Sequence, residues 1–511
     1  MRRLIRLSLA IGAVTALGGG LLAVAETGSA AVPESALTAP EAALAQAATS
    51  GPTPAPTPAP TSAPTSAAAK PDFNGDGRAD IAVGNPNATV SGQTGAGKIT
   101  AFYGGADGLS FSRRQVITQN TPGMAEEAEE DDGFGYAHAV GDFNADGYSD
   151  LAVSAPHEGV VGRVFVLWGS PGGLTGGTAI SRPSTTVSSW GSTMTAGDFD
   201  GDGRSDLVAT GHSNVVFTYD NLSPSPGSRS VSSRLLPISM ALGGVEGLTA
   251  GDANGDGRDD LIARGMSAAN GVHDTHFWVP GTAAGLAVPP FTRTLPAGES
   301  VAIGDINGDS YGDVVIGLPW DDSWNPGVPG HLPPGTVPGG KVTVRYGSAS
   351  GPSHYGRIIT QGTDNIPSSA SPNRDQFGYS LSLGDINGDG KADLAIGARG
   401  KDINGVEGPG AVTVLYGTAA GPNTSLRIQQ YAQSSPGVPG DDEPGDFFGH
   451  SLGLTDVNGD GKADLTILAP QKGQNSLTTL LSNGQFITTV GATVFDPHAL
   501  GVTHQLPGTN S

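Results

Sequence analysis

The chain reads Phe377-Gly-Tyr-Ser-Leu-Ser-Leu-Gly-Asp385-Ile-Asn-Gly-Asp-Gly-Lys-Ala-Asp393-Leu-Ala-Ile-Gly-Ala398 in its fullest copy of a repeated unit. Its centre is an aspartate-rich nonapeptide, and an apolar run rich in leucine or β-branched residues follows at once. Seven such nonapeptides, which we number as acidic loops 1 to 7, occupy residues 72–80, 142–150, 198–206, 252–260, 305–313, 385–393 and 456–464. Their first aspartates lie 70, 56, 54, 53, 80 and 71 residues apart, an interval that indicates a repeat architecture.

Each repeat contains four strand-like runs, A to D, with the acidic loop between A and B. In the fullest copy, B is Leu394–Ala398, C is Ala411–Gly417 and D is Ser425–Gln429. Four short strands in roughly sixty residues are typical of one propeller blade. Oxygen-bearing side chains at positions 1, 3, 5 and 9 of each acidic loop are what a hard divalent cation prefers. The fold class is therefore expected to be all-β, a seven-bladed β-propeller with a calcium-binding loop in each blade.

Composition agrees with many short strands joined by turns. Glycine supplies 80 of the 511 residues and proline 38, and no stretch has a sustained helical period. The net charge of −23 argues against nucleic acid, whose phosphates need basic residues, and against anionic membrane surfaces. Seven Ca²⁺ ions would offset fourteen of these negative charges, so the acidity needs no separate acidic partner.

The N-terminal region predicts export. Residues 1–31 combine basic residues at Arg2, Arg3 and Arg6 with an apolar stretch and small-residue cleavage positions, as in a signal peptide. An uncleaved membrane anchor is the alternative. Residues 32–70 are almost entirely Ala, Pro, Ser and Thr and predict a disordered, extended linker. The chain has no cysteine and so forms no disulfide, and calcium is therefore expected to stabilise the secreted protein instead.

The propeller is expected to span residues 71–505, followed by a tail at 506–511. Loop 1 follows the linker directly, so the first blade lacks its own strand A. In the seventh repeat we place B at Leu465–Leu468, C at Leu477–Leu481 and D at Phe486–Val490. The remaining C-terminal stretch, with Thr493–Phe495 and Leu500–Thr503, is expected to supply the missing strand and close the ring, which removes free sheet edges.

The Phe-Gly opening, the acidic loop and the Leu-x-x-Gly-Ala run together resemble the FG-GAP repeat of integrin α-subunit head propellers and their bacterial relatives. This resemblance covers nearly the whole region after the linker and is specific for fold, but one propeller scaffold hosts adhesins, lectins and enzyme appendages. It implies up to seven structural Ca²⁺ ions. In each loop, side chains at positions 1, 3, 5 and 9 and the carbonyl at position 7 would be the ligands.

Mapped onto this sequence, the implied metal ligands are Asp72, Asn74, Asp76, Arg78, Asp80, Asp142, Asn144, Asp146, Tyr148, Asp150, Asp198, Asp200, Asp202, Arg204, Asp206, Asp252, Asn254, Asp256, Arg258, Asp260, Asp305, Asn307, Asp309, Tyr311, Asp313, Asp385, Asn387, Asp389, Lys391, Asp393, Asp456, Asn458, Asp460, Lys462 and Asp464. Loop 5 has Ser310 in place of a glycine and is expected to be the weakest site, and loop 2 has Ala145 at position 4. The alternative is that these loops are only Asx-rich turns. Four converging carboxyl or amide groups in one loop would repel one another without a cation, and seven copies with intact acidic positions favour calcium.

Because successive strands run in opposite directions, the acidic loops (A–B) and the C–D turns lie on one face, which we call the loop face. The B–C and D–A connections lie on the opposite face and are longer and more irregular. Function tends to lie on variable loops of a rigid scaffold, so the opposite face is the expected binding surface. Trp320 and Trp324 are its candidate contact residues, and folding back within their own loop is the alternative.

Enzyme signals are weak. Gly449-His450-Ser451-Leu452-Gly453 matches a hydrolase nucleophile elbow but falls inside a predicted strand A. His273 and His276, near Asp274, are expected on a surface loop. No catalytic or organic-cofactor-binding residue is assigned. The expected function is a secreted, calcium-stabilised, monomeric, non-catalytic binding or adhesion module whose partner is an extracellular protein or polysaccharide, with no nucleic acid and no membrane after signal cleavage. The alternatives are a carbohydrate-binding lectin and a secreted hydrolase or lyase.

Overall fold

The fold is seen in a computed structural model. It describes residues 70–159, 161–180, 188–211, 216–224, 232–236, 240–267, 275–287, 293–320, 335–369, 373–471 and 474–495. The predicted signal peptide, most of the linker, Trp324, His273, Asp274, Leu500–Thr503 and the tail lie outside these residues. Every regular element in the described part is a β-strand. None of those residues forms a helix with the length and apolar character that a membrane crossing requires.

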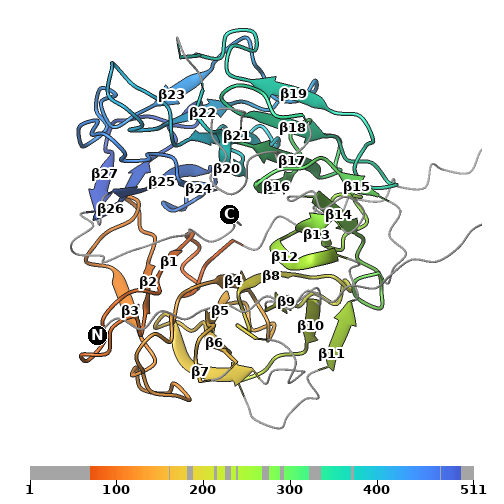
Figure 1. Cartoon of the computed structure of the whole chain (residues 1–511), viewed down its shortest axis with the longest axis vertical. Helices are drawn as coiled ribbons and strands as arrows, with labels where there is room; N and C mark the ends of the chain where they lie inside the picture. The colour runs from red at the N-terminus through yellow and green to blue at the C-terminus, as the bar shows by residue number, and fades with distance from the viewer. Residues whose placement is uncertain are drawn as a thin grey trace, which may run out of the picture. The chain divides into compact units, whose positions relative to one another are not determined.

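The strands form seven antiparallel sheets, which we number as blades 1 to 7. Blade 1 has three strands, β1 (Ile81–Asn85), β2 (Lys98–Phe102) and β3 (Arg114–Ile117). Each of the other six has four, in the order A, B, C, D along the sequence and across the sheet. The all-β, seven-bladed propeller is therefore confirmed (Figure 1).

The remaining strands have the following bounds. Blade 2 contains β4 (His138–Gly141), β5 (Asp150–Ala155), β6 (Arg163–Trp168) and β7 (Thr175–Ile180). Blade 3 contains β8 (Thr193–Gly197), β9 (Asp206–Thr210), β10 (Val216–Asp220) and β11 (Ser232–Leu236). Blade 4 contains β12 (Met240–Gly251), β13 (Asp260–Ser267), β14 (Thr275–Val279) and β15 (Thr294–Leu295).

Blade 5 contains β16 (Ser300–Gly304), β17 (Asp313–Leu318), β18 (Lys341–Arg345) and β19 (Arg357–Thr360). Blade 6 contains β20 (Phe377–Gly384), β21 (Asp393–Ala398), β22 (Ala411–Leu415) and β23 (Gln429–Tyr431). Blade 7 contains β24 (Ser451–Thr455), β25 (Asp464–Gln471), β26 (Gln474–Leu480) and β27 (Thr493–Phe495).

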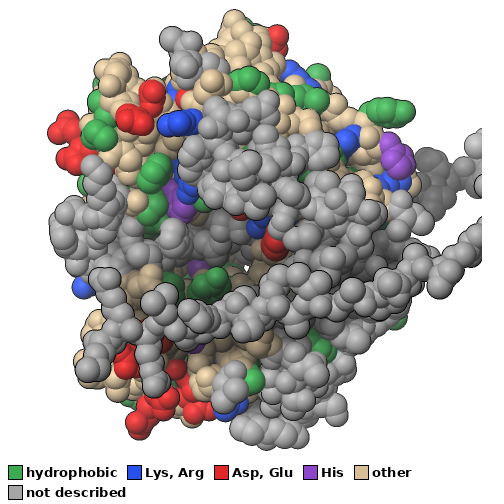
Figure 2. Space-filling view, viewed as in Figure 1, with side chains coloured by type: hydrophobic (Ala, Val, Ile, Leu, Met, Phe, Trp, Pro, Cys, Tyr) green, Lys and Arg blue, Asp and Glu red, His purple; other side chains and the backbone are tan. Residues whose placement is uncertain are grey.

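The A strands surround the centre of the ring, and each contacts the next from β4 to β24 (Figure 1). Residues of these strands, among them Ala139, Gly304 and Leu383, line a central hollow of about 560 Å³. Figure 2, in the same view, shows this hollow in the middle of the ring. The B strands have blades on both sides, so β5 and β21 are buried at every residue. Their nearly continuous apolar runs in the sequence follow from this two-sided burial.

The Phe-Gly pair that opens a repeat joins neighbouring blades. The phenylalanine side chains of Phe134, Phe377 and Phe448 are fully buried, and Trp190 takes the same place before blade 3. The Phe134 amide donates to the Ala96 carbonyl at 2.9 Å, just before strand C of the preceding blade. The start of each such repeat is thus hydrogen-bonded to the blade before it, which orders the blades around the ring.

Two predicted outer strands are wrong. In blade 6, strand D is β23 (Gln429–Tyr431), because Asn423 first forms a turn by accepting the amides of Ser425 and Leu426. In blade 7, residues 486–490 do not pair with β26. The carbonyl of Ile487 instead accepts bonds from Gln429 and Tyr431 of blade 6, so this apolar run packs on the neighbouring blade.

Of the C-terminal stretch expected to close the ring, only Thr493–Phe495 is described, and it differs from the expectation; Leu500–Thr503 lies outside the described residues. Among the described residues blade 1 has no strand A, and Thr493–Phe495 pairs with β26 as the outermost strand of blade 7. It does not fill the inner place in blade 1. The seam between blades 7 and 1 is an apolar cluster that includes Ile81, Leu468 and Phe495. In it the rings of Phe102 and Phe495 stack 5.4 Å apart at an interplanar angle of 6°.

Candidate functional site

Each acidic loop curls around the carboxylate of its first aspartate. In loop 1, Oδ1 of Asp72 accepts the amides of Gly75 and Asp76 at 2.7 and 3.1 Å, and Oδ2 accepts the amide of Gly77 at 2.8 Å. Gly75 and Gly77 have φ values of 71° and 83°, which glycine adopts without strain. The curl brings the oxygen-bearing side chains of positions 1, 3 and 5 to one side of the loop.

Loop 3 shows the convergence most fully, because its third position is Asp200 where the other loops have asparagine. Carboxylate oxygens of Asp198, Asp200 and Asp202 lie within 4.8 Å of one another. Burial raises the pKa of Asp200, and the charges of Asp202 and Asp198 raise it further. An all-oxygen, negatively charged group of this size fits a hard divalent cation such as Ca²⁺. The residues present therefore suit the metal that the resemblance implies.

The ninth aspartate has a second role that sequence analysis missed. In loop 1, Asp80 is fully buried and its two carboxylate oxygens accept the amides of Phe73 and Gly104, each at 2.8 Å. Gly104 follows strand C, so the side chain ties the acidic loop to the C–D turn. The same pair of hydrogen bonds from backbone amides recurs at Asp150, Asp260, Asp313, Asp393 and Asp464.

Burial raises the pKa of these six ninth-position carboxyls to about 7, and that of Asp206 to about 8. Asp206 is not among the three carboxylates that converge in loop 3. Carboxylate oxygens have two lone pairs each, so a bond from an amide leaves room for a metal. The assignment of position 9 as a ligand stays a prediction.

The seven loops are joined in a closed circle of backbone hydrogen bonds, which we call the hoop. At every blade junction, the amide of position 8 donates to the carbonyl of position 1 in the preceding loop, at 2.7–3.1 Å. The pairs are Ala79 to Asp456, Ser149 to Asp72, Ser205 to Asp142, Asp259 to Asp198, Gly312 to Asp252, Ala392 to Asp305 and Ala463 to Asp385. Each predicted metal loop therefore holds its neighbour in place.

Position 7 contributes to the same junctions through its side chain. Nε of Arg78 donates to the carbonyl of Asn458 at 3.2 Å, and Arg204 and Arg258 reach the carbonyls of Asn144 and Asp200. Each acceptor is the third residue of the preceding loop. The coordination of a metal by the position 7 carbonyl stays a prediction.

Loops 2 and 5 depart from the pattern where the sequence does. Ser310 adopts a left-handed φ of 71°, and its amide still donates to Oδ2 of Asp305 at 2.7 Å. Ala145 also has a positive φ, of 56°. A side chain in this conformation costs about 1–2 kcal/mol relative to the right-handed region. The curl is thus kept at the cost of backbone strain.

The opposite face carries an aromatic and cationic cluster that bridges three blades. Trp320, in the B–C connection of blade 5, packs edge-to-face on Tyr379 of β20, with centroids 6.4 Å apart. Tyr379 stacks on His450 at 5.1 Å, and the guanidinium of Arg399 lies 3.5 Å from the Tyr379 ring centroid. Trp320 is half-buried, so it packs against the next blade and still presents part of its ring to solvent.

Two other sequence signals have structural explanations. Ser451 begins β24, pairs with Leu468 and is only 3% exposed, so the Gly-x-Ser-x-Gly pattern is part of an inner strand. His276 was expected on a surface loop, and that expectation is wrong. It lies in β14, is fully buried and donates from Nδ1 to the carbonyl of Pro296 at 2.7 Å.

Sequence comparisons agree with this geometry. The FG-GAP repeat family matches residues 63–102, 297–344, 377–415 and 448–480, and the FG-GAP-like repeat matches residues 142–209 and 198–263. Together the matches cover more than half of the chain, which therefore belongs to the FG-GAP repeat family of integrin α-like β-propellers.

Among curated relatives, phosphatidylinositol-glycan-specific phospholipase D of Mus musculus is 38% identical over 27% of this chain and 17% of its own length. Integrin alpha-PS3 of Drosophila melanogaster is 32% identical over 29% of this chain and 13% of its own length. The chain thus spans less than a fifth of these relatives. The crystal structure of AofleA from Arthrobotrys oligospora aligns over 70% of this chain and 87% of that chain, with a TM-score of 0.34 and 10% identity.

Proposed function

We propose that this propeller is a secreted, calcium-stabilised, non-catalytic binding module that engages an extracellular protein or polysaccharide through its opposite face. The observation that carries the proposal is the structural difference between the regular loop face and the irregular opposite face. The loop face repeats one arrangement seven times and is joined by the hoop. The opposite face does not repeat one arrangement in every blade, and at blades 5 and 6 it carries the cluster of Trp320, Tyr379 and Arg399.

Calcium would act on stability. The side chains of positions 1, 3 and 5 would hold the ion in each loop, which would neutralise their charges. Extracellular sites bind near 10⁻⁴ M, so about 1 mM Ca²⁺ contributes about 1.4 kcal/mol per site and about 10 kcal/mol over seven. That sum is comparable with the net stability of a whole domain.

The aromatic cluster supports binding rather than catalysis. An aromatic ring beside a guanidinium offers apolar contact and hydrogen-bond donors together, a pairing enriched at protein interfaces. A sugar ring or an acidic side chain would suit the same surface, which keeps a lectin function as the second candidate. The burial of Ser451 in an inner strand gives no comparable support to the hydrolase alternative.

A binding experiment with matched variants tests the proposal. The full chain would be immobilised with Ca²⁺ and exposed to cell-wall polysaccharides, extracellular-matrix fractions and a sugar array. Trp320→Ala should weaken capture by at least tenfold. Tyr355→Ala should not, because Tyr355 is 90% exposed but lies in the C–D turn of blade 5, on the loop face. Equal binding by both variants would contradict the choice of face.

A further inference from the structure

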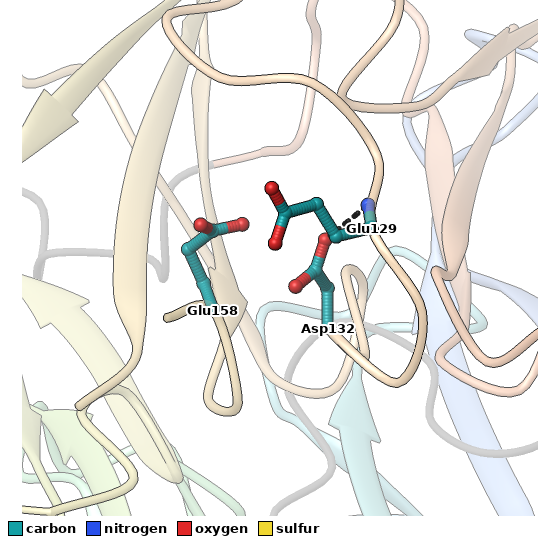
Figure 3. A group of neighbouring side chains, drawn as sticks. All are labelled: Glu129, Asp132 and Glu158. Atoms are coloured by element: carbon teal, nitrogen blue, oxygen red, sulfur yellow. Dashed lines mark hydrogen bonds between the residues drawn. The ribbon is translucent and has the colours of Figure 1, made fainter. Parts of the chain in front are cut away.

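Three acidic side chains meet on the opposite face, at the junction of blades 1 and 2. Glu129 and Asp132 lie in the connection from β3 to β4, and Glu158 lies in the connection from β5 to β6. Figure 3 shows their carboxylates pointing toward one another, and their oxygens lie within 4.8 Å of one another. Asp132 is 2% exposed and accepts the backbone amide of Glu129 at 2.6 Å, which ties its side chain to the backbone of the connection from β3 to β4.

A buried amide is directed at this group. Gln119 is 1% exposed, and its Nε2 donates to Oε2 of Glu158 at 2.6 Å. Its carbonyl oxygen, Oε1, is also buried but has no hydrogen-bond partner. A buried oxygen without a partner costs about 1–3 kcal/mol, so its retention needs an explanation.

The junction of blades 5 and 6 contains a related arrangement around a buried aspartate and a glutamine. Asp375 precedes its Phe-Gly pair by two residues, as Asp132 does, and it accepts Nε2 of Gln361 at 2.9 Å. There the third member is Lys401. Its ammonium donates to Oε1 of Gln361 at 2.5 Å and lies 3.4 Å from the Asp375 carboxylate. This junction therefore has its own internal cation.

Glu158 occupies the place of that lysine. Glu158 lies three residues after the end of β5, and Lys401 lies three residues after the end of β21. Blade 2 thus replaces a buried ammonium by a carboxylate, and leaves the glutamine oxygen without the donor that Lys401 supplies to Gln361. Arg163 of β6 pairs with Glu126 at 3.0 Å. Burial raises the pKa of Glu158 to about 7, and the Asp132 charge adds to the rise, as expected for carboxylates without a counter-charge.

We propose that Glu129, Asp132, Glu158 and the side-chain oxygen of Gln119 hold one hard divalent cation in the place that the Lys401 ammonium occupies in blade 6. Three carboxylates and an amide form an all-oxygen donor set, which suits Ca²⁺ or a similar ion. A half-turn of the Gln119 amide exchanges its nitrogen and oxygen and directs the oxygen at the ion. The ion clamps the β3–β4 connection to the β5–β6 connection. This site is separate from the acidic loops and does not depend on their binding calcium.

Counting bound ions in a charge-matched pair of variants tests the site. Glu158→Lys copies the arrangement of blade 6, and Glu130→Lys makes the same charge change at an exposed neighbour outside the group. In native mass spectrometry with saturating Ca²⁺, Glu158→Lys should carry one ion fewer than the unaltered protein. Glu130→Lys should keep the full number. An unchanged count in Glu158→Lys would overturn the proposal, whatever the loops bind.

A second measurement avoids any variant and decides the case if Glu158→Lys fails to fold. Crystals of the unaltered protein soaked in Mn²⁺ should show an anomalous peak enclosed by Glu129, Asp132 and Glu158. Peaks confined to the acidic loops, or none at all, would refute the site. If Glu158→Lys does fold, its melting temperature in chelator should exceed that of the unaltered protein, because the lysine supplies the cation that the chelator removes.

Discussion

The amide of Ala79 donates to the carbonyl of Asp456 at 2.8 Å, which joins the first acidic loop to the last. This single bond completes the hoop and makes the loop face continuous around the propeller. Lys70 adds an ion pair to the Asp456 carboxylate at 3.0 Å across the same seam. Because each loop is braced by its neighbours, disorder in one loop removes support from the next. Stabilisation by ions should therefore be cooperative around the ring.

If the seven loops bind calcium as proposed, they would together contribute about 10 kcal/mol, and its removal should lower the melting temperature by on the order of 10 °C in a chain of this size. The measurement is differential scanning calorimetry in excess chelator and again after Ca²⁺ is restored. A transition that does not move with chelator would count against calcium in the loops.

Disruption of the seam should destabilise the whole ring. Phe495→Ala removes the ring that stacks on Phe102, and the loss should be about 3 kcal/mol in urea unfolding. Val494→Ala, at a neighbouring and more exposed position of β27, is the control and should cost much less. A truncation after Val490 deletes β27 entirely and should aggregate, since it exposes the edge of β26. A soluble truncation with unchanged stability would contradict this account of the seam.

Relief of backbone strain in loop 5 should stabilise the protein. Ser310→Gly places a residue without a Cβ at a φ of 71°, and the gain should be about 1 kcal/mol in the free energy of unfolding. Ser310→Ala is the control, because alanine keeps the strain. If glycine and alanine behave alike, the left-handed conformation is not the source of the weakness expected in loop 5.

Acid should destabilise the protein through His276. Burial lowers the pKa of this imidazole to about 3 in the folded state, against about 6.5 when unfolded. Between these values the unfolded chain binds a proton that the folded chain does not, so stability falls as the pH drops below about 6.5. The slope is at most about 1.4 kcal/mol per pH unit. Urea unfolding at pH 7 and pH 5 measures it.

The variant His276→Gln separates this histidine from the many carboxylates that titrate in the same range. Its amide can still donate toward the Pro296 carbonyl but does not titrate, so the loss of stability from pH 7 to pH 5 should shrink. The exposed His157→Gln is the control and should keep the original pH dependence. If the unaltered protein and both variants lose the same stability from pH 7 to pH 5, His276 does not cause the pH dependence.

Much of the fold was predictable because its signals are local. An acidic nonapeptide, a following apolar run and a Phe-Gly opening identify strands A and B within about twenty residues, and β20 and β21 lie where these signals place them. The outer strands were misplaced in blades 6 and 7. Their apolar residues resemble strands in either position, and the choice between pairing with strand C and packing on the neighbouring blade depends on contacts such as that of Ile487 with Tyr431.

The candidate sites divide in the same way. Loop residues such as Asp198, Asp200 and Asp202 were predicted together, because a tight turn brings close neighbours in sequence into contact. The packing of Trp320 on Tyr379, and the meeting of Glu158 with Asp132, join different blades. An alignment of the repeats places Glu158 at the position of Lys401. That alignment was the available signal for the meeting of Glu158 with Asp132.

By itself, the sequence determined the number of blades, the order of their strands and the acidic loops, since short apolar runs and turn-forming Asp, Asn and Gly act over a few residues. Only the tertiary structure decided how the first and last blades meet, which side chains share a junction and where the buried charges lack a partner. Those features depend on the rotation of one blade against the next, which brings together residues that are far apart in the chain.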